Sequence, residues 1–112
     1  MLAALVTFTA FGDSDYDRLC VNGHPRARVP IEYPLPARHG FERDHMIPRC
    51  LGGPNDAANV WYQPIDEARR KDVLERAMCD SYCAGKVSLP EAQQFFSSGK
   101  WRQLLGMKVL LP

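Results

Sequence analysis

The pattern of hydrophobic and polar positions predicts two short strands in the middle of the chain, over residues 41–47 and 59–63. Pro48 ends the first strand and Pro64 ends the second, because proline lacks the backbone N–H that a strand ladder needs. Between them, the glycine-rich run of residues 52–56 predicts a turn, so the strands form a hairpin-like unit. Alternation in the first strand places Phe41, Arg43 and His45 on one face and Glu42, Asp44 and Met46 on the other.

From Ile65 onwards the apolar residues recur every three or four positions, which predicts a helix that ends near Gly85. A second helix begins after Ser88, which is placed to form a capping box with Glu91, and it runs to about Phe96. A strand pair followed by helices predicts an α+β fold. The apolar stripe of the first helix consists of Ile65, Ala68, Leu74, Ala77, Met78 and Tyr82.

The C-terminal segment is apolar. Trp101, Leu104 and Leu105 are expected to pack back on the core through a short last helix or turn. Met107–Pro112 forms a tail for which a strand and disorder are both open alternatives.

The N-terminal part of the chain divides into two segments. Residues 1–12 suit either an export signal or a β-strand, since apolar residues alternate with Thr7 and Thr9. This apolar segment is too short to span a bilayer. The first alternative implies a periplasmic or secreted protein, and the second a cytoplasmic one. Residues 13–40 form a proline-rich irregular arm, with an extended stretch over Arg26–Tyr33.

The composition is that of one globular domain. The chain has 112 residues, of which 46% are hydrophobic and 24% are charged, and it contains no internal repeat. The formal net charge of +1 does not by itself indicate nucleic acid, but local Lys and Arg residues can still bind phosphates.

The chain contains four cysteines: Cys20, Cys50, Cys79 and Cys83. In an oxidising compartment they could form two disulfides, with three possible pairings. In a reducing compartment they would be free thiols or zinc ligands, although the usual pair of Cys-x-x-Cys motifs is absent.

The candidate chemistry lies at the end of the first strand, where Asp44 and His45 are adjacent. Hydrolysis of a phosphodiester needs an activated water and stabilisation of charge on the leaving oxygen. A neutral imidazole is a suitable base near pH 7, and a carboxylate can hold a divalent ion. A regular strand would point these two side chains to opposite faces, so one shared site requires the strand end to twist or bulge.

Four segments, in this order, resemble the HNH endonucleases of the ββα-metal fold, and more narrowly their small DHxIPxxLGG subgroup. They are DHMIPRCLGG, NVWYQP, ARRKDVLE and CAGKVSLPEAQ, which together lie within about residues 40–101. Each segment alone is weakly specific, and their order and spacing carry the resemblance. It implies an HNH core with a helical C-terminal cap over residues 41–112.

The resemblance implies a metal-dependent, largely sequence-nonspecific endonuclease that hydrolyses DNA, with RNA as a further substrate. Asp44 would bind Mg²⁺ or Mn²⁺, with Zn²⁺ as an alternative, and His45 would be the general base. Asn59 would brace the loop between the strands. Nucleic acid is the expected partner, and no membrane partner is expected.

The third position of the family's metal site is Ala68 here, and alanine offers no ligand atom. Alanine is usual at this position in the subgroup, so activity is still expected. Water or another side chain would complete the metal shell. The candidates are Glu67, Asp72, Gln63 and Glu42, of which Glu67 is preferred because it neighbours the missing ligand.

Ala68 also leaves a second function open, namely a non-catalytic HNH-like module that binds nucleic acid or a protein. A small structural domain held by disulfides or zinc is a third alternative. Basic residues near the motif are expected to contact substrate phosphates, with a solvated surface as the alternative reading. These residues are Arg43, Arg69, Arg70 and Lys71.

The resemblance also bears on the cysteines. Members of the group often have a cysteine at the positions of Cys20 and Cys83, which implies a disulfide between these two. Cys50 and Cys79 would then form a second disulfide, which joins the loop to the same helix.

Overall fold

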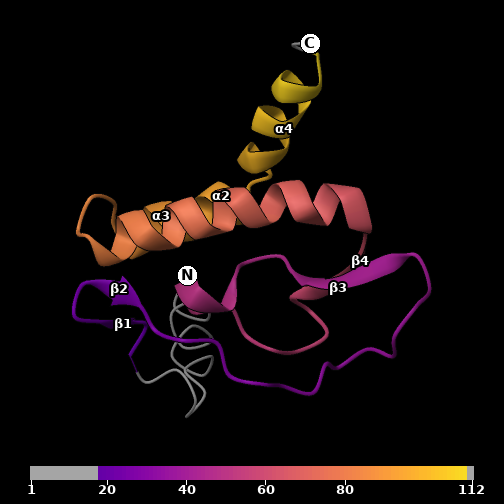
Figure 1. Cartoon of the computed structure of the whole chain (residues 1–112), viewed down its shortest axis with the longest axis horizontal. Coiled ribbons are helices and arrows are strands. Elements are labelled where there is room, and N and C mark those ends of the chain that lie inside the picture. Colours follow the sequence, from indigo (N-terminus) through magenta and orange to yellow (C-terminus); the bar gives the residue numbers. More distant parts are fainter. Residues whose placement is uncertain (1–17, 111–112) are drawn as a thin grey trace, which may run out of the picture.

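The computed structural model describes residues 18–110, with side chains described through Leu105. This part of the chain has an α+β fold with two small antiparallel sheets and three α-helices, which confirms the expected fold class. Helix α2 lies across both strand pairs, and α3 lies alongside it (Figure 1). The elements are β1 (Cys20–Val21), β2 (His24–Pro25), β3 (Phe41–His45), the 3-10 helix η2 (Arg49–Leu51), β4 (Val60–Pro64), α2 (Ile65–Cys83), α3 (Leu89–Ser97) and α4 (Lys100–Leu110).

Strands β3 and β4 form the predicted antiparallel pair, with Asp44 opposite Trp61. Strand β3 ends at His45, two residues earlier than expected, and β4 is shifted by one residue toward Pro64. The two faces of β3 are as predicted. Asp44 contacts α2, whereas the ring of His45 lies against Tyr33 of the proline-rich arm.

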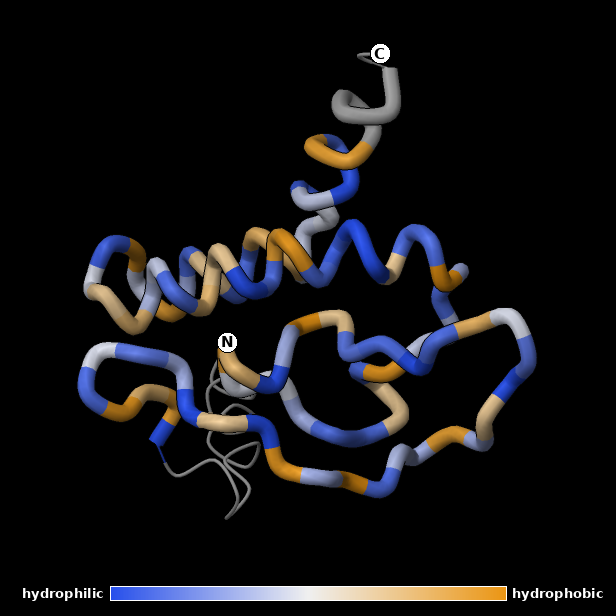
Figure 2. Tube along the Cα trace, in the orientation of Figure 1, coloured by the Kyte–Doolittle hydropathy of each residue, from blue (hydrophilic) through white to orange (hydrophobic). Residues whose placement is uncertain are grey.

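Helix α2 carries hydrophilic residues along much of its length (Figure 2). Its buried residues are Ala68, Lys71 and Cys79, so a lysine lies in the face that packs against the fold. Ile65 is 38% exposed, and Ala77 is also exposed, so these two members of the predicted stripe do not pack inside. The remaining members of the stripe, Leu74, Met78 and Tyr82, do pack against the core.

Helices α3 and α4 form the cap. The predicted capping box is present, because Ser88 Oγ accepts from the Glu91 backbone N–H and the Glu91 carboxylate accepts from the Ser88 N–H. Helix α4 continues through Leu110, which corrects the expectation of a strand or disorder from Met107 onward. Leu104 is 41% exposed and is not part of the core. Within residues 18–110, no helix combines the length and apolar character needed to cross a membrane.

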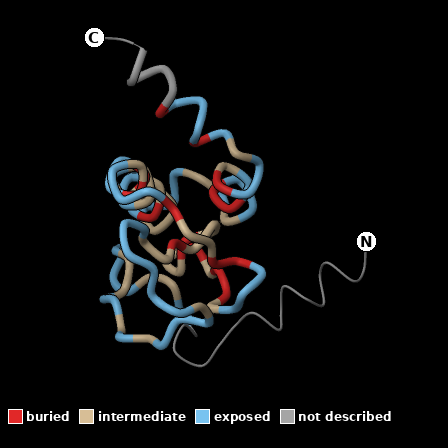
Figure 3. Tube along the Cα trace, turned by 90° about the vertical axis from the view of Figure 1, so that its right-hand side faces the viewer, coloured by how far each residue is buried: buried red, intermediate tan, exposed pale blue. Residues whose placement is uncertain are grey.

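The core lies between α2, the cap and the loop that follows β3, where the buried segments gather in Figure 3. It is a small cluster, against which further partly buried hydrophobic residues pack. Its fully or almost fully buried members are Leu51, Cys79, Ala92, Phe96, Trp101 and Leu105.

The arm begins with a short hairpin, β1–β2, that was not expected from the sequence. Asn22 and Gly23 form its turn, and both have positive φ angles (53° and 79°) as a tight hairpin turn requires. Residues 1–17 and 111–112 lie outside the described residues, including the segment 1–12 for which a signal or strand was predicted.

The rest of the arm runs beneath the β3–β4 pair and is held by its backbone carbonyl groups. The Leu35 carbonyl accepts from Arg43 at 3.0 Å, and the Glu32 carbonyl accepts from Asn55 Nδ2 at 2.7 Å. The Pro36 carbonyl accepts from the Tyr62 hydroxyl at 2.6 Å.

Both predicted disulfides are present. Cys20–Cys83 ties the start of the arm to the end of α2, with the Cα atoms 5.6 Å apart. Cys50–Cys79 ties η2 to the middle of α2, with a Cα separation of 6.0 Å. All four cysteines are therefore bonded, which excludes the zinc alternative for these thiols.

Among the glycines whose surroundings the structure describes, Gly53 is the one whose replacement the fold tolerates least. A Cβ at this position would collide with the Ile47 carbonyl, so Gly53→Ala is expected to lower the free energy of unfolding by about 3 kcal/mol or more. Gly85→Ala is the matched control, because an added Cβ there meets no atom within 4 Å and only the positive φ is strained, at about 1 kcal/mol. Urea denaturation of both variants measures the difference, and equal losses would contradict the prediction.

Candidate active site

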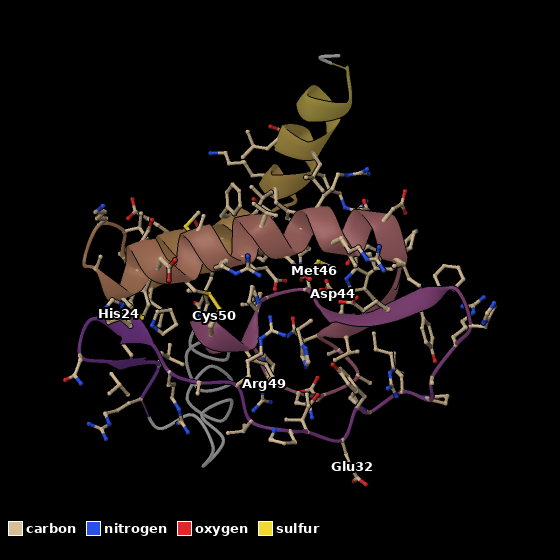
Figure 4. All side chains as sticks on the ribbon, viewed as in Figure 1. His24, Glu32, Asp44, Met46, Arg49 and Cys50 are labelled. Carbon is tan, nitrogen blue, oxygen red and sulfur yellow. A yellow bond between two sulfur atoms is a disulfide. The ribbon has the colours of Figure 1, made fainter. Side chains whose placement is uncertain are left out.

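Asp44 and His45 line one cavity of about 400 Å³, enclosed by the arm, β3, η2 and α2. Both residues therefore line the same cavity, although their side chains lie on opposite faces of β3. Figure 4 shows Asp44 between β3 and α2, and Glu32 on the outer edge of the arm. The Arg, His, Asp and Glu residues of the lining are Arg26, Arg28, Glu42, Arg43, Asp44, His45, Arg49, Asp72, Glu75, Arg76 and Asp80.

Asp44 is almost fully buried, at 5% exposure, and its Oδ2 atom accepts two hydrogen bonds. Lys71 Nζ donates to Oδ2 at 2.7 Å, and Trp61 Nε1 donates at 3.0 Å. Both donors come from the elements that follow the loop, β4 and α2. The carboxylate is thus part of a buried ion pair.

His45 is held by Asn55, with Nε2 at 2.9 Å from Asn55 Oδ1. The Asn55 amide nitrogen donates to the Glu32 carbonyl, which leaves the amide oxygen to face the imidazole. Since that oxygen can only accept, Nε2 must carry the proton, and the lone pair of the neutral ring is on Nδ1. Tyr33 covers the ring, with centroids 5.6 Å apart.

The surroundings of His45 favour the neutral imidazole. Burial lowers the pKa of His45 below its ordinary value of 6.5, and the nearby Arg49 and Lys71 charges act in the same direction. Asn55 and Asp44 oppose this shift, but burial is the larger effect. The ring is therefore able to accept a proton at neutral pH.

Asn59 braces the loop, as the resemblance implied. Its Oδ1 accepts from the Ile47 N–H at 3.0 Å. Its Nδ2 donates to the carbonyl groups of Ile47 and Pro54, each at 3.0 Å. The amide thus closes the loop between β3 and β4 on itself, and the loop in turn positions Asn55.

Three of the other carboxyl groups that line the cavity, Glu42, Asp72 and Glu75, have pKa values that burial raises. Burial raises the pKa of Glu75 to about 7, although the Lys71 ammonium at 2.7 Å opposes it. Burial and the neighbouring carboxylates raise the pKa of Glu42. Burial also raises the pKa of Asp72, which Arg28 partly offsets. Acidic side chains therefore line the cavity from both β3 and α2.

The predicted substrate-binding residues divide into two groups. Arg43 lines the cavity, where its guanidinium lies 4.2 Å from the centre of the Tyr33 ring. Arg69 and Arg70 are exposed on α2 and do not line the cavity. Lys71 has no exposed surface, which corrects the expectation that it meets phosphates. The reason is that its position on α2 faces Asp44 and the core.

Glu67 does not join Asp44. It pairs with Arg102 of α4 at 3.4 Å and is not part of the cavity lining. Of the other candidate ligands, Glu42 and Asp72 do line the cavity. Gln63 is fully buried away from that lining.

The donor set around Asp44 does not fit the divalent metal centre that the resemblance implies. Such a centre needs several oxygen ligands around one point. In residues 18–110, no three His, Cys, Asp or Glu side chains are arranged to hold a metal ion. Asp44 Oδ2 already receives two N–H donors, and the helical position is the buried Ala68. No chemical step is therefore assigned to a metal.

Comparison with protein-family models, with curated proteins and with solved structures found no match for this chain. The geometry of the cavity and the resemblance of the motifs are what support a function.

Sequence reasoning missed several residues of the site, among them Asn55, Trp61 and Glu75. Asn55 sits in a turn-forming run and looks like an ordinary turn residue, so only its distance from His45 reveals its role. Trp61 has the character of an ordinary core aromatic residue, yet its indole N–H donates to Asp44. Glu75 follows Lys71 by four residues on a helix, and this spacing is itself a sequence signal for an ion pair.

The raised pKa of Glu75 predicts that stability falls as pH rises. The folded state retains this proton up to about pH 7, whereas an unfolded glutamate loses it near 4.5. The free energy of unfolding should therefore decrease by about 3 kcal/mol from this group as pH rises from about 4.5 to 8. Glu75→Gln should remove that decrease, as measured by urea denaturation across this range.

Asp66→Asn is the control for the pH series, because Asp66 is an exposed carboxyl on the same helix. It should keep the pH dependence of the wild-type protein. An unchanged pH dependence in Glu75→Gln would show that Glu75 is ionised throughout.

The hydrogen bond to Asn55 predicts one tautomer of His45. Two-dimensional ¹⁵N NMR of the histidine rings should show the Nε2–H form of His45, with a titration midpoint below 6.5. Asn55→Ala should release the ring and allow both tautomers. A dominant Nδ1–H form in the wild-type protein would contradict the assignment.

Proposed function

We propose that this protein is an endonuclease of the HNH type that hydrolyses phosphodiester bonds in nucleic acid, with DNA as the principal substrate and RNA as a further one. The observation that carries the proposal is the His45 imidazole. It lines a cavity with basic residues, Asn55 fixes its tautomer, and burial lowers its pKa. The order of motifs that resembles the HNH endonucleases supports the same function.

In the proposed reaction, His45 Nδ1 accepts a proton from a water molecule as the water oxygen bonds to phosphorus. The bond from phosphorus to the leaving sugar oxygen breaks, and solvent supplies the proton that this oxygen gains. Tyr33 and Asn55 hold the ring from two sides, so the base is positioned before substrate arrives. Asn59 acts through the loop and is a positioning residue.

Basic residues of the cavity would stabilise the charge on the phosphate. Arg43 lies on the same face of β3 as His45, two residues away. Arg28 comes from the arm, Arg49 from η2 and Arg76 from α2, so positive charge approaches the cavity from several directions. Guanidinium groups suit this role because their N–H donors match the phosphate oxygens.

Plasmid nicking tests the proposal. Wild-type protein should convert supercoiled DNA to the open circle, and His45→Ala should slow this conversion by roughly 10²–10⁴-fold, the range for loss of a general base. Reactions with Mg²⁺, Mn²⁺ and EDTA run in parallel, together with a single-stranded oligonucleotide and an RNA of the same sequence.

His39→Ala is the matched control, because His39 is exposed on the arm and does not line the cavity. It should cleave at the wild-type rate. Absence of cleavage by folded wild-type protein under every condition would overturn the enzymatic proposal. Binding of the oligonucleotide without cleavage would then identify the chain as a non-catalytic binding module.

A further inference from the structure

The Lys71 ammonium makes hydrogen bonds to three different acceptors. Its ammonium donates to Asp44 Oδ2 at 2.7 Å, to the His45 carbonyl at 2.8 Å and to Glu75 Oε2 at 2.7 Å. These three bonds use all three N–H donors of a lysine. The side chain is fully buried, and the ammonium lies 5.3 Å from the centres of the Phe96 and Trp101 rings.

The ammonium therefore lies directly beside the carboxylate that the resemblance implies as a metal ligand. Oδ2 of Asp44 is surrounded by Lys71 and by the indole N–H of Trp61. A divalent ion bound at that oxygen would meet two N–H groups and a positive charge within a few ångströms. In a buried site such repulsion is poorly screened.

Moving the Lys71 ammonium away from Asp44 to admit a divalent ion would also be unfavourable. The ammonium would leave two of its acceptors, Asp44 and the His45 carbonyl, while it remained enclosed by aromatic rings. Separating a buried ion pair of this kind commonly weakens an equilibrium by a hundred-fold or more. The other expected ligand, Glu67, is engaged with Arg102 instead.

We propose that the Lys71 ammonium is the resident cation of this site and takes the place beside Asp44 that a divalent ion takes in the resembled family. Lys71 touches no substrate and acts as a positioning residue. It holds the Asp44 carboxylate and the His45 backbone in one geometry. The inference rests on the proposed function in one respect, since it implies that cleavage needs no divalent ion at Asp44.

Paramagnetic NMR with Mn²⁺ tests this without relying on cleavage. The Trp61 indole N–H is bonded to Asp44 Oδ2, so its resonance should broaden if Mn²⁺ binds that carboxylate. We expect Mn²⁺ to broaden the Trp61 resonance of the wild-type protein no more than that of Asp44→Asn. Lys71→Met keeps the aliphatic stem but removes the charge, and it should gain a Mn²⁺ site that Asp44→Asn abolishes in the same background.

Wild-type broadening by Mn²⁺ whose affinity falls ten-fold or more in Asp44→Asn would overturn the proposal. If circular dichroism shows that a variant does not fold, the titration of the wild-type protein with Mn²⁺ still tests the proposal. Trp61 broadening at Mn²⁺ concentrations below that of the protein overturns the proposal, and a sharp Trp61 resonance at millimolar Mn²⁺ supports it. Because no arm of this experiment requires cleavage, an inactive protein would count against the nuclease proposal alone.

Discussion

A buried positive charge joins the parts of this small protein. The ammonium of Lys71, on α2, binds Asp44 and the backbone at the end of β3, and it rests against rings from α3 and α4. Four elements therefore meet at one atom. A buried ammonium is tolerated only while each of its donors is satisfied, so these elements have one favourable arrangement relative to each other. This constraint also fixes the backbone at the end of β3, where His45 lies.

Much of the fold could be predicted from local chemistry. Pro64 ends β4, the Ser88 capping box starts α3, and both disulfides follow the pairing that the resemblance implied. These features depend on residues close in sequence or on a stated family pattern. The β1–β2 hairpin also had a local signal, the Asn22–Gly23 pair, which favours tight hairpin turns. It was obscured by the prolines around it.

The site was only partly predictable, for a physical reason. The adjacency of Asp44 and His45 and the later Asn59 were visible as a pattern, and the bracing geometry of Asn59 agrees with its implied role. The partners of Asp44 were not visible, because Lys71 lies far along the chain in a run of basic residues that reads as a solvated helix face. Which member of such a run points inward depends on how the helix packs. Asn55 likewise gains its role only when the loop closes.

The manner in which the arm is attached has an evolutionary consequence. Arg43, Asn55 and Tyr62 all hold it by backbone carbonyl groups, which every residue possesses, proline included. The side chains at those arm positions can therefore change identity without loosening the arm. Glu32, Leu35 and Pro36 are not part of the cavity lining, so related proteins could vary them while the wall of the cavity stays in place.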